Sequence, residues 1–207
     1  MQLADTLFLI AVIVFSAIIH EVMHGVAADK LGDPTARYAG RLTLNPFPHI
    51  DLFGSILLPA MLALSHSPLF FAWAKPVPYN PFNLRAGRFS EAMVAFAGPL
   101  SNAVIALISA LLIRSGALAQ INDILLIIVI VNVMLFFFNL IPIPPLDGSK
   151  VLQPFLPGPL GRGYEEWRTR MEQNPFLGMG LIVIVILLMG NTFGRFIYGI
   201  ANAVAGV

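Results

Sequence analysis

The sequence contains no cysteine, and this absence removes several kinds of chemistry at once. None of the 207 residues is a cysteine, so the chain forms no disulfide, offers no thiolate ligand to a metal and has no cysteine nucleophile. Charged residues are also scarce, at 11% of the chain, whereas soluble domains carry about a quarter. The chain therefore lacks the polar side chains that would cover a water-facing surface.

The few charges that are present give no sign of a nucleic-acid partner. The formal net charge is +1, and the Lys and Arg residues are scattered along the chain. Proteins that bind nucleic acid concentrate positive charge on one face or stripe, because phosphate contacts dominate their affinity. We expect no nucleic-acid partner.

What the chain has in abundance is apolar sequence. Hydrophobic residues make up 57% of it, and about 20 apolar residues in a helix are enough to cross the hydrocarbon core of a bilayer. The stretches with few or no charges are residues 3–26, 52–74, 92–113, 124–141 and 176–193. The sequence predicts an all-α polytopic membrane protein, with about four to six transmembrane helices, a re-entrant segment and a short β-like loop.

These segments predict a single membrane-embedded domain over residues 1–207. Its lipid-facing surface makes the bilayer itself a partner, and no long polar segment indicates an added soluble domain. The expected elements are a helix over 3–28, a re-entrant or spanning segment over 52–74, and helices over 90–113, 121–141 and 174–193 or longer.

The first apolar stretch contains three polar residues in the pattern HEVMH. His20 and His24 are four residues apart and so share one helix face, with Glu21 beside them. In H-E-x-x-H the two imidazoles chelate zinc and the glutamate is the general base that acts on water. Ionisable side chains at membrane depth are costly and are usually functional. The pattern therefore predicts a zinc site, against the plainer alternative of polar residues at a helix end.

A catalytic zinc takes three protein ligands and keeps one open position, so a third ligand is expected. His49, in the stiff loop NPFPHID, is one candidate. Asp147 is favoured, because it follows the proline-broken run FNLIPIPP, and irregular backbone at membrane depth occurs where it lines a cavity. The alternative for Asp147 is a helix N-cap. Asp33 and Asp51 are expected to be solvated loop residues.

Three motifs together resemble the site-2 protease family of intramembrane zinc metalloproteases. The first is HEVMH. The second, NLIPIPPLDG, is similar to the family pattern N-x-x-P-x-P-x-x-D-G at Asn139, Pro142, Pro144, Asp147 and Gly148. The third, AGPLSN, is similar to G-P-x-x-N at Gly98, Pro99 and Asn102. No PDZ or CBS module, which many relatives carry, is found.

The resemblance implies one Zn²⁺ held by His20, His24 and Asp147, with Glu21 as base and Asn139 near the reacting carbonyl. It implies cleavage of peptide bonds in or near transmembrane segments of membrane proteins, with those proteins as partners. The alternatives are a membrane ion or metal transporter and a non-catalytic relative that binds helices. A transporter is disfavoured because the chain lacks matched repeats and carries Glu at the base position.

Asn102 has two interpretations. It donates to the oxyanion of the reaction, or it hydrogen-bonds a neighbouring helix, as Asn side chains do in lipid.

The ligands must meet, and this constrains the topology. If His24 and Asp147 lie at the same side of the membrane, residues 52–74 leave and return on that side, because twenty-odd residues cannot cross twice. We predict a re-entrant hairpin there. Most Lys and Arg residues then face one side, which the positive-inside rule makes cytoplasmic. The expected location is the cell (inner) membrane, with the active site toward the cytoplasm.

Residues 37–44 are predicted to form an edge strand that holds the substrate. Several residues in ARYAGRLTL favour β structure, and the stretch follows the HEVMH helix closely. Adding the substrate as a strand would satisfy the backbone of an unwound transmembrane segment.

Overall fold

The structure is a computed structural model that describes residues 3–57, 61, 74–85 and 87–207. The chain divides into two compact units, Met1–Arg85 and Ala86–Val207. Each unit is built from helices, and the described residues contain no β-strand. The single domain over 1–207 stays a prediction.

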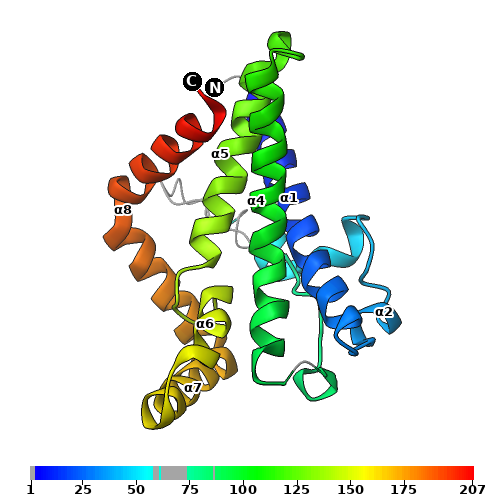
Figure 1. Cartoon of the computed structure of the whole chain (residues 1–207), viewed down its shortest axis with the longest axis vertical. Helices are drawn as coiled ribbons and strands as arrows, with labels where there is room; N and C mark the ends of the chain where they lie inside the picture. Colours follow the sequence, from blue (N-terminus) through cyan, green and yellow to red (C-terminus); the bar gives the residue numbers. More distant parts are fainter. Residues whose placement is uncertain (1–2, 58–60, 62–73, 86) are drawn as a thin grey trace. The chain divides into compact units, whose positions relative to one another are not determined.

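The first unit is dominated by one long helix, α1 (Leu3–Lys30), followed by short turns (Figure 1). The HEVMH residues lie in the second half of this largely apolar helix. The short elements after it are the helix α2 (Thr35–Tyr38), the 3-10 turns η1 (Phe47–His49) and η3 (Pro81–Asn83), and the π-helix η2 (Leu52–Leu57).

The second unit contains three long helices and two shorter ones. In Figure 1, α4 and α5 run side by side, and α8 bends midway along its length. The bounds are η4 (Gly87–Phe89), α4 (Ser90–Ser115), η5 (Ala119–Ile121), α5 (Asn122–Asn139), α6 (Asp147–Leu152), η6 (Gln153–Phe155), α7 (Gly158–Gln173) and α8 (Pro175–Ala205).

Four helical segments are long and apolar enough to cross a membrane, which confirms the all-α polytopic class. They are Ala4–Lys30, Gly87–Ser115, Ala119–Asn139 and Phe176–Ala205. Only 12% to 39% of their most apolar windows is buried inside the protein. Most of these apolar side chains therefore face outward, and lipid is the solvent that suits them.

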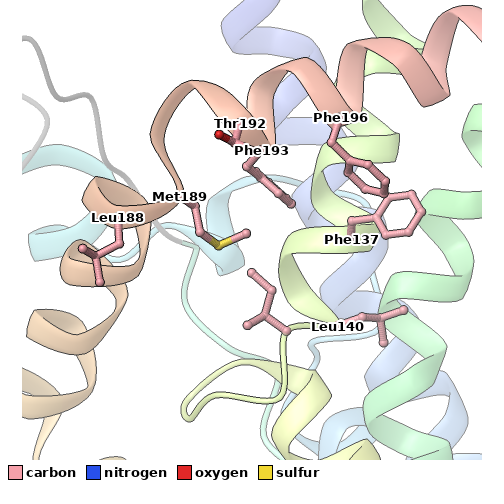
Figure 2. Close-up of a pocket in the computed structure, with 8 residues that line it drawn as sticks. Phe137, Leu140, Leu188, Met189, Thr192, Phe193 and Phe196 are labelled. Atoms are coloured by element: carbon pink, nitrogen blue, oxygen red, sulfur yellow. The ribbon is translucent and has the colours of Figure 1, made fainter.

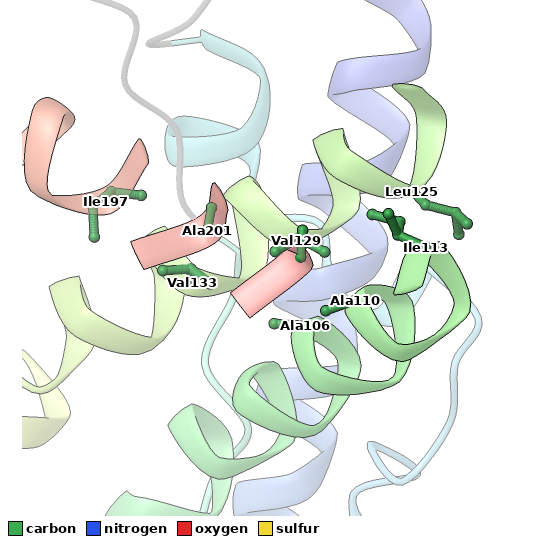
Figure 3. Packing of buried hydrophobic residues seen from close by; sticks show 9 residues of the cluster. Ala106, Ala110, Ile113, Leu125, Val129, Val133, Ile197 and Ala201 are labelled. Carbon is green, nitrogen blue, oxygen red and sulfur yellow. The ribbon is translucent and has the colours of Figure 1, made fainter. Parts of the chain in front are cut away.

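The core of the second unit lies where α4, α5 and α8 meet (Figure 3). Its buried residues include Ala106 and Ala110 from α4, Val129 from α5, and Ala201 from α8. Small side chains at these positions allow close approach of helix backbones. Close approach matters in lipid, because van der Waals packing replaces the hydrophobic driving force between helices.

The last helix, predicted over 174–193 or longer, runs over Pro175–Ala205 and is bent. Residues 196–205 extend it to a C-cap at Gly206, whose φ is +79°. The bend is at Gly190, with φ 38° and ψ −133°. This left-handed conformation is open to glycine and strained for other residues, so glycine permits the bend.

An apolar pocket of about 620 Å³ opens between the end of α5 and the bend of α8 (Figure 2). Phe137 of α5 and Phe196 of α8 face each other, with ring centroids 5.1 Å apart. The other lining residues are Leu140, Ile141, Leu188, Met189, Thr192 and Phe193. No side chain that lines it is titratable, and the Thr192 hydroxyl is the one polar side-chain group in a lining that is otherwise apolar.

The predicted edge strand over residues 37–44 is wrong. Residues 35–38 form α2, and turns and bends follow it. The N–H groups of Tyr38 and Arg41 donate to the carbonyls of Pro34 and Ala36, at 3.0 Å each. An edge strand needs unpaired N–H groups, and local turn bonds have already taken these. The pattern of strand-favouring residues misled because Pro34 starts a helical turn.

Most of the predicted hairpin over residues 52–74 lies outside the described residues. Of this segment the structure describes only 52–57, 61 and 74, and 52–57 form η2. The re-entrant path stays a prediction.

Candidate active site

His20 and His24 lie together on one face of α1. Their rings stack edge to face, with centroids 4.7 Å apart and planes at 87°. The two side chains are only 6% and 8% exposed. The spacing of one helical turn thus places two imidazoles side by side in a buried setting, as chelation of one metal ion requires.

Glu21 is half-buried on the same helix, and its carboxylate is held by the chain. The backbone N–H of Val77 donates to Glu21 Oε2 at 2.9 Å. Val77 is itself 5% exposed. A stretch far along the sequence therefore lies against the HEVMH turn.

Gly25, which directly follows His24, lets that stretch come close. A Cβ on Gly25 would lie 2.6 Å from Leu42 Cδ2, 2.8 Å from Val77 Cγ1 and 3.0 Å from Ala36 Cβ. Real Cβ atoms essentially never approach other atoms closer than 3.0 Å. Glycine at this position therefore allows residues 36, 42 and 77 to pack closely on α1, and a Cβ would make these side chains shift.

Asp33 is fully buried, contrary to the solvated role expected from the sequence. Oδ1 accepts from the Asn83 amide at 2.8 Å and from the Thr35 hydroxyl at 2.5 Å, and Oδ2 accepts from Asn80 N–H at 2.6 Å. Burial raises the pKa of Asp33, but these hydrogen bonds together lower it below its ordinary value of 3.8. The ionised carboxylate therefore ties the end of α1 to residues 80–83.

His49, the rival zinc ligand, is occupied in holding its own loop. Its side chain is 2% exposed, and Nε2 donates to the Thr43 carbonyl at 2.9 Å. Its backbone carbonyl accepts from Lys75 N–H at 2.8 Å. These contacts give His49 a structural role in its loop, while its buried Nδ1 has no hydrogen-bond partner among the described residues.

Asp147 is the first residue of α6, in the second unit. The N-cap of α6 is Leu146, in extended conformation at φ −69° and ψ 154°, and no side chain caps the helix. The N-cap interpretation of Asp147 is therefore wrong. The proline-rich loop after Asn139 leads directly into this residue, which is half-buried.

The start of α6 is packed directly on the backbone at the end of α5. A Cβ on Gly148 would lie 2.5 Å from the Ile141 carbonyl oxygen and closer still to the Leu140 carbonyl. Glycine is the only residue that leaves room for these carbonyls. The residue that follows Asp147 thus sets how near Asp147 sits to the end of α5.

Helix α7 contacts the proline-rich loop that precedes Asp147. The Tyr164 hydroxyl donates to the Pro142 carbonyl at 2.9 Å. Burial raises the pKa of Tyr164, partly offset by the charge of Arg168, so the hydroxyl remains a donor at neutral pH. Arg168 joins α7 to α4 through Glu91, at 2.8 Å between Nη1 and Oε1. The loop before Asp147 is therefore bonded to α7, which is itself anchored to α4.

The two asparagines proposed for catalysis differ in their surroundings. Asn139 is half-buried at the end of α5, where its amide donates to the Leu135 carbonyl at 2.9 Å. Asn102 is 0% exposed, and its amide donates to Asn132 Oδ1 at 2.9 Å. Asn132 in turn donates to the Ile128 carbonyl. For Asn102 the structure thus shows the interhelical hydrogen bond that was the second interpretation.

Replacing Asn102 by Leu is expected to lower the stability of the protein rather than its chemistry. Asn132 Oδ1 would lose its donor in a buried site, at a cost of about 1 kcal/mol in lipid. Thermal unfolding in detergent should show a lower midpoint, partly restored when Asn132→Leu is added, since both polar groups are then gone. A loss of turnover above about 100-fold with unchanged unfolding would instead support the oxyanion role of Asn102.

Sequence reasoning missed two residues that shape this site. Asn132 carried a signal, because it is an amide in the middle of the apolar run 124–141 and needs a buried partner. Val77 carried none, because its contribution is a backbone N–H, which every residue except proline has.

An HExxH turn inside an all-helical membrane protein defines a membrane metalloprotease. The family model described as Peptidase family M50 matches residues 112–190, which include Asn139 and Asp147. The chain is 31% identical over 206 residues to "Putative zinc metalloprotease YwhC" of Bacillus subtilis, a match that covers 95% of this chain and 86% of the relative. It is 27% identical over 186 residues to "Putative zinc metalloprotease Rip2" of Mycolicibacterium smegmatis, covering 88% and 67%.

The chain belongs to peptidase family M50, the site-2 proteases, which confirms the resemblance read from its motifs. It is a zinc metalloprotease by family and an integral membrane protein by its four candidate spans. No solved structure matches the chain.

Proposed function

We propose that the protein is an intramembrane zinc metalloendopeptidase that cuts membrane proteins in or near their transmembrane segments. The observation that carries the proposal is the position of the HEVMH turn. His20, Glu21 and His24 belong to a helix that is apolar enough to span the membrane, so the reactive groups lie where a transmembrane substrate is.

The proposed ligands of one Zn²⁺ are His20, His24 and Asp147. Two buried imidazoles on one helix face and one carboxylate make the donor set of a catalytic zinc site, with one position left open. When bound, zinc supplies a water acidified to a pKa of about 7 and a Lewis acid for the scissile carbonyl.

Residues of the chain would transfer the proton of the attacking water and stabilise the negative charge that develops on the carbonyl oxygen. Glu21 takes the proton of the attacking water and passes it to the leaving amine. Asn139, at the end of α5, would donate to the reacting carbonyl oxygen. A role for Asn102 as a second donor stays a prediction. Its amide already donates to Asn132, as described above, and this is the alternative role. Each such donor is worth about 3 to 4 kcal/mol of transition-state stabilisation.

The substrate helix must unwind before it is cut. A transmembrane helix satisfies its amides internally, so its carbonyls are not accessible while it remains helical. Substrates with Gly, Pro or Asn near the cleaved bond would unwind at a lower cost. We expect these residues to favour cleavage.

Cleavage of a single-span model substrate in proteoliposomes tests the proposal. The purified chain should cut inside or at the edge of the span, as mass spectrometry of the fragments would show, and Glu21→Gln should be slower by about 10² to 10⁴-fold. Cuts confined to water-exposed segments would contradict the intramembrane site. Binding without cleavage would indicate a non-catalytic relative, and ion flux through the unaltered chain would indicate a transporter.

We also propose that the active site faces the cytoplasm, as the charge distribution favours. Single cysteines are informative, because the chain has none of its own. Tyr38 and Phe82 are 84% and 96% exposed, and Tyr38→Cys and Phe82→Cys should react with an impermeant maleimide only from the cytoplasmic side. Ala117→Cys, in the turn between α4 and α5, should react only from the opposite side. Labelling of Phe82→Cys from outside would overturn the assignment.

A further inference from the structure

The run Lys75-Pro76-Val77-Pro78-Tyr79 contains a single backbone N–H between Lys75 and Tyr79. Proline has no N–H, so Pro76 and Pro78 donate nothing, and Val77 supplies the one donor of the three. That donor is bound to Glu21 Oε2 at 2.9 Å. The two prolines thus isolate one N–H, and the fold directs it at the proposed general base.

The backbone around Val77 is held from several directions. A residue that precedes proline is restricted to extended conformations, so Pro78 limits the orientation of Val77. Arg41, only 7% exposed, donates from Nη2 to the Lys75 carbonyl at 2.7 Å and to the Pro76 carbonyl at 3.3 Å. The two carbonyls before Val77 are therefore clamped by one buried guanidinium.

The other side of Val77 is set by α1 itself. Its side chain packs where Gly25 has no Cβ, as described above, and it is 5% exposed. The stretch is therefore packed on α1 through the Val77 side chain and hydrogen-bonded to Arg41 through the carbonyls of Lys75 and Pro76. The N–H of Val77 is a fixed donor.

We propose that Val77 is a positioning residue whose backbone N–H orients the carboxylate of Glu21. The inference depends on the proposed role of Glu21 as general base. With Oε2 bound to Val77, rotation of the carboxylate is restricted, and Oε1 is left to accept the proton of the attacking water. A partner of this kind acts by keeping a reactive group in its productive geometry. The side chain of Val77 is secondary to this role.

Three replacements at position 77 separate the N–H from the side chain. Val77→Pro removes the N–H and suits an extended backbone. Replacement of Val77 by its α-hydroxy acid turns the amide into an ester, which removes the N–H and keeps the side chain. Val77→Ala keeps the N–H and shortens the side chain, and it is the matched control. Each protein is assayed for zinc content and for kcat and KM on a single-span model substrate that the unaltered chain cleaves.

Val77→Pro and the ester variant should lose about 10- to 100-fold in kcat, the range typical of such supporting groups, with KM and zinc content unchanged. Val77→Ala, which keeps the N–H, should lose clearly less kcat than the ester variant, because it changes only the packing of the side chain on α1. An ester variant with unchanged kcat overturns the proposal. An ester variant with raised kcat also overturns it, because the hydrogen bond from Val77 would then hinder Glu21 rather than orient it for catalysis. If Val77→Pro fails to fold, the ester variant decides alone.

Glu21→Gln, measured in the same assay, keeps the two proposals apart. If Glu21→Gln is inactive while the ester variant is fully active, only the positioning role of Val77 fails. If Glu21→Gln cleaves at the unaltered rate, the role of Glu21 as base fails, and the inference about Val77 fails with it.

Discussion

His20→Ala, His24→Ala and Asp147→Ala are each expected to leave the purified protein nearly free of zinc. A catalytic site has only three protein ligands, so the loss of one removes a third of the donor set. Even groups that merely support a ligand change metal affinity by about 10- to 100-fold, so a ligand itself should exceed about 100-fold. Metal analysis of the purified chains by mass spectrometry measures the effect directly.

Two variants serve as controls for the zinc measurement. Glu21→Gln should keep its zinc and lose turnover, because the proposed base is not a ligand. His49→Ala should also keep its zinc, because the His49 ring already donates to the Thr43 carbonyl within its own loop. Zinc lost from His49→Ala and kept in Asp147→Ala would show that the third ligand was wrongly chosen.

Gly148→Ala is expected to inactivate the enzyme although it adds only one methyl group. The new Cβ would overlap the carbonyl groups of Leu140 and Ile141 at the end of α5. A flexible side chain could move aside, but these are backbone atoms, so α6 must shift and carry Asp147 with it. Overpacking typically costs about 1 to 3 kcal/mol, and a clash with backbone belongs at or above the upper end.

The measurement pairs Gly148→Ala with Gly163→Ala. Gly163 lies on the exposed face of α7, and a Cβ there would have no atom within 4 Å. Gly163→Ala should keep full zinc and activity and should gain up to about 1 kcal/mol of stability, because Ala is the better helix former. Gly148→Ala with normal zinc content, unfolding midpoint and turnover would contradict the packing described for α6.

The long helices could be predicted from the sequence because their cause is local. A run of about 20 apolar residues suits lipid whatever surrounds it. The predicted 90–113 and 121–141 correspond to Ser90–Ser115 and Asn122–Asn139. The end of α8 was left open by the prediction, and beyond Arg195 one face of the helix, with Ile197 and Ala201, is buried in the core formed with α4 and α5.

The short elements between the helices were predicted less well. The strand proposed for residues 37–44 followed side-chain preference, but Pro34 begins a turn whose carbonyls take the N–H groups a strand needs. Asp33 looked like a loop carboxylate, and it is buried because Asn80 and Asn83 come back to it from about 50 residues away. Preference scales cannot anticipate partners at such separations.

By itself the sequence determined that this chain is an integral membrane protein and that it carries the two histidines of an HExxH motif on one helix face. Both follow from spacing along one segment: apolar length for the membrane, and the helical repeat for His20 and His24. Only the tertiary structure decided that Val77 donates to Glu21, 56 residues away, and that Asn102 pairs with Asn132, 30 residues away. These bonds depend on which segments meet when the chain packs, and no local pattern of side chains encodes that meeting.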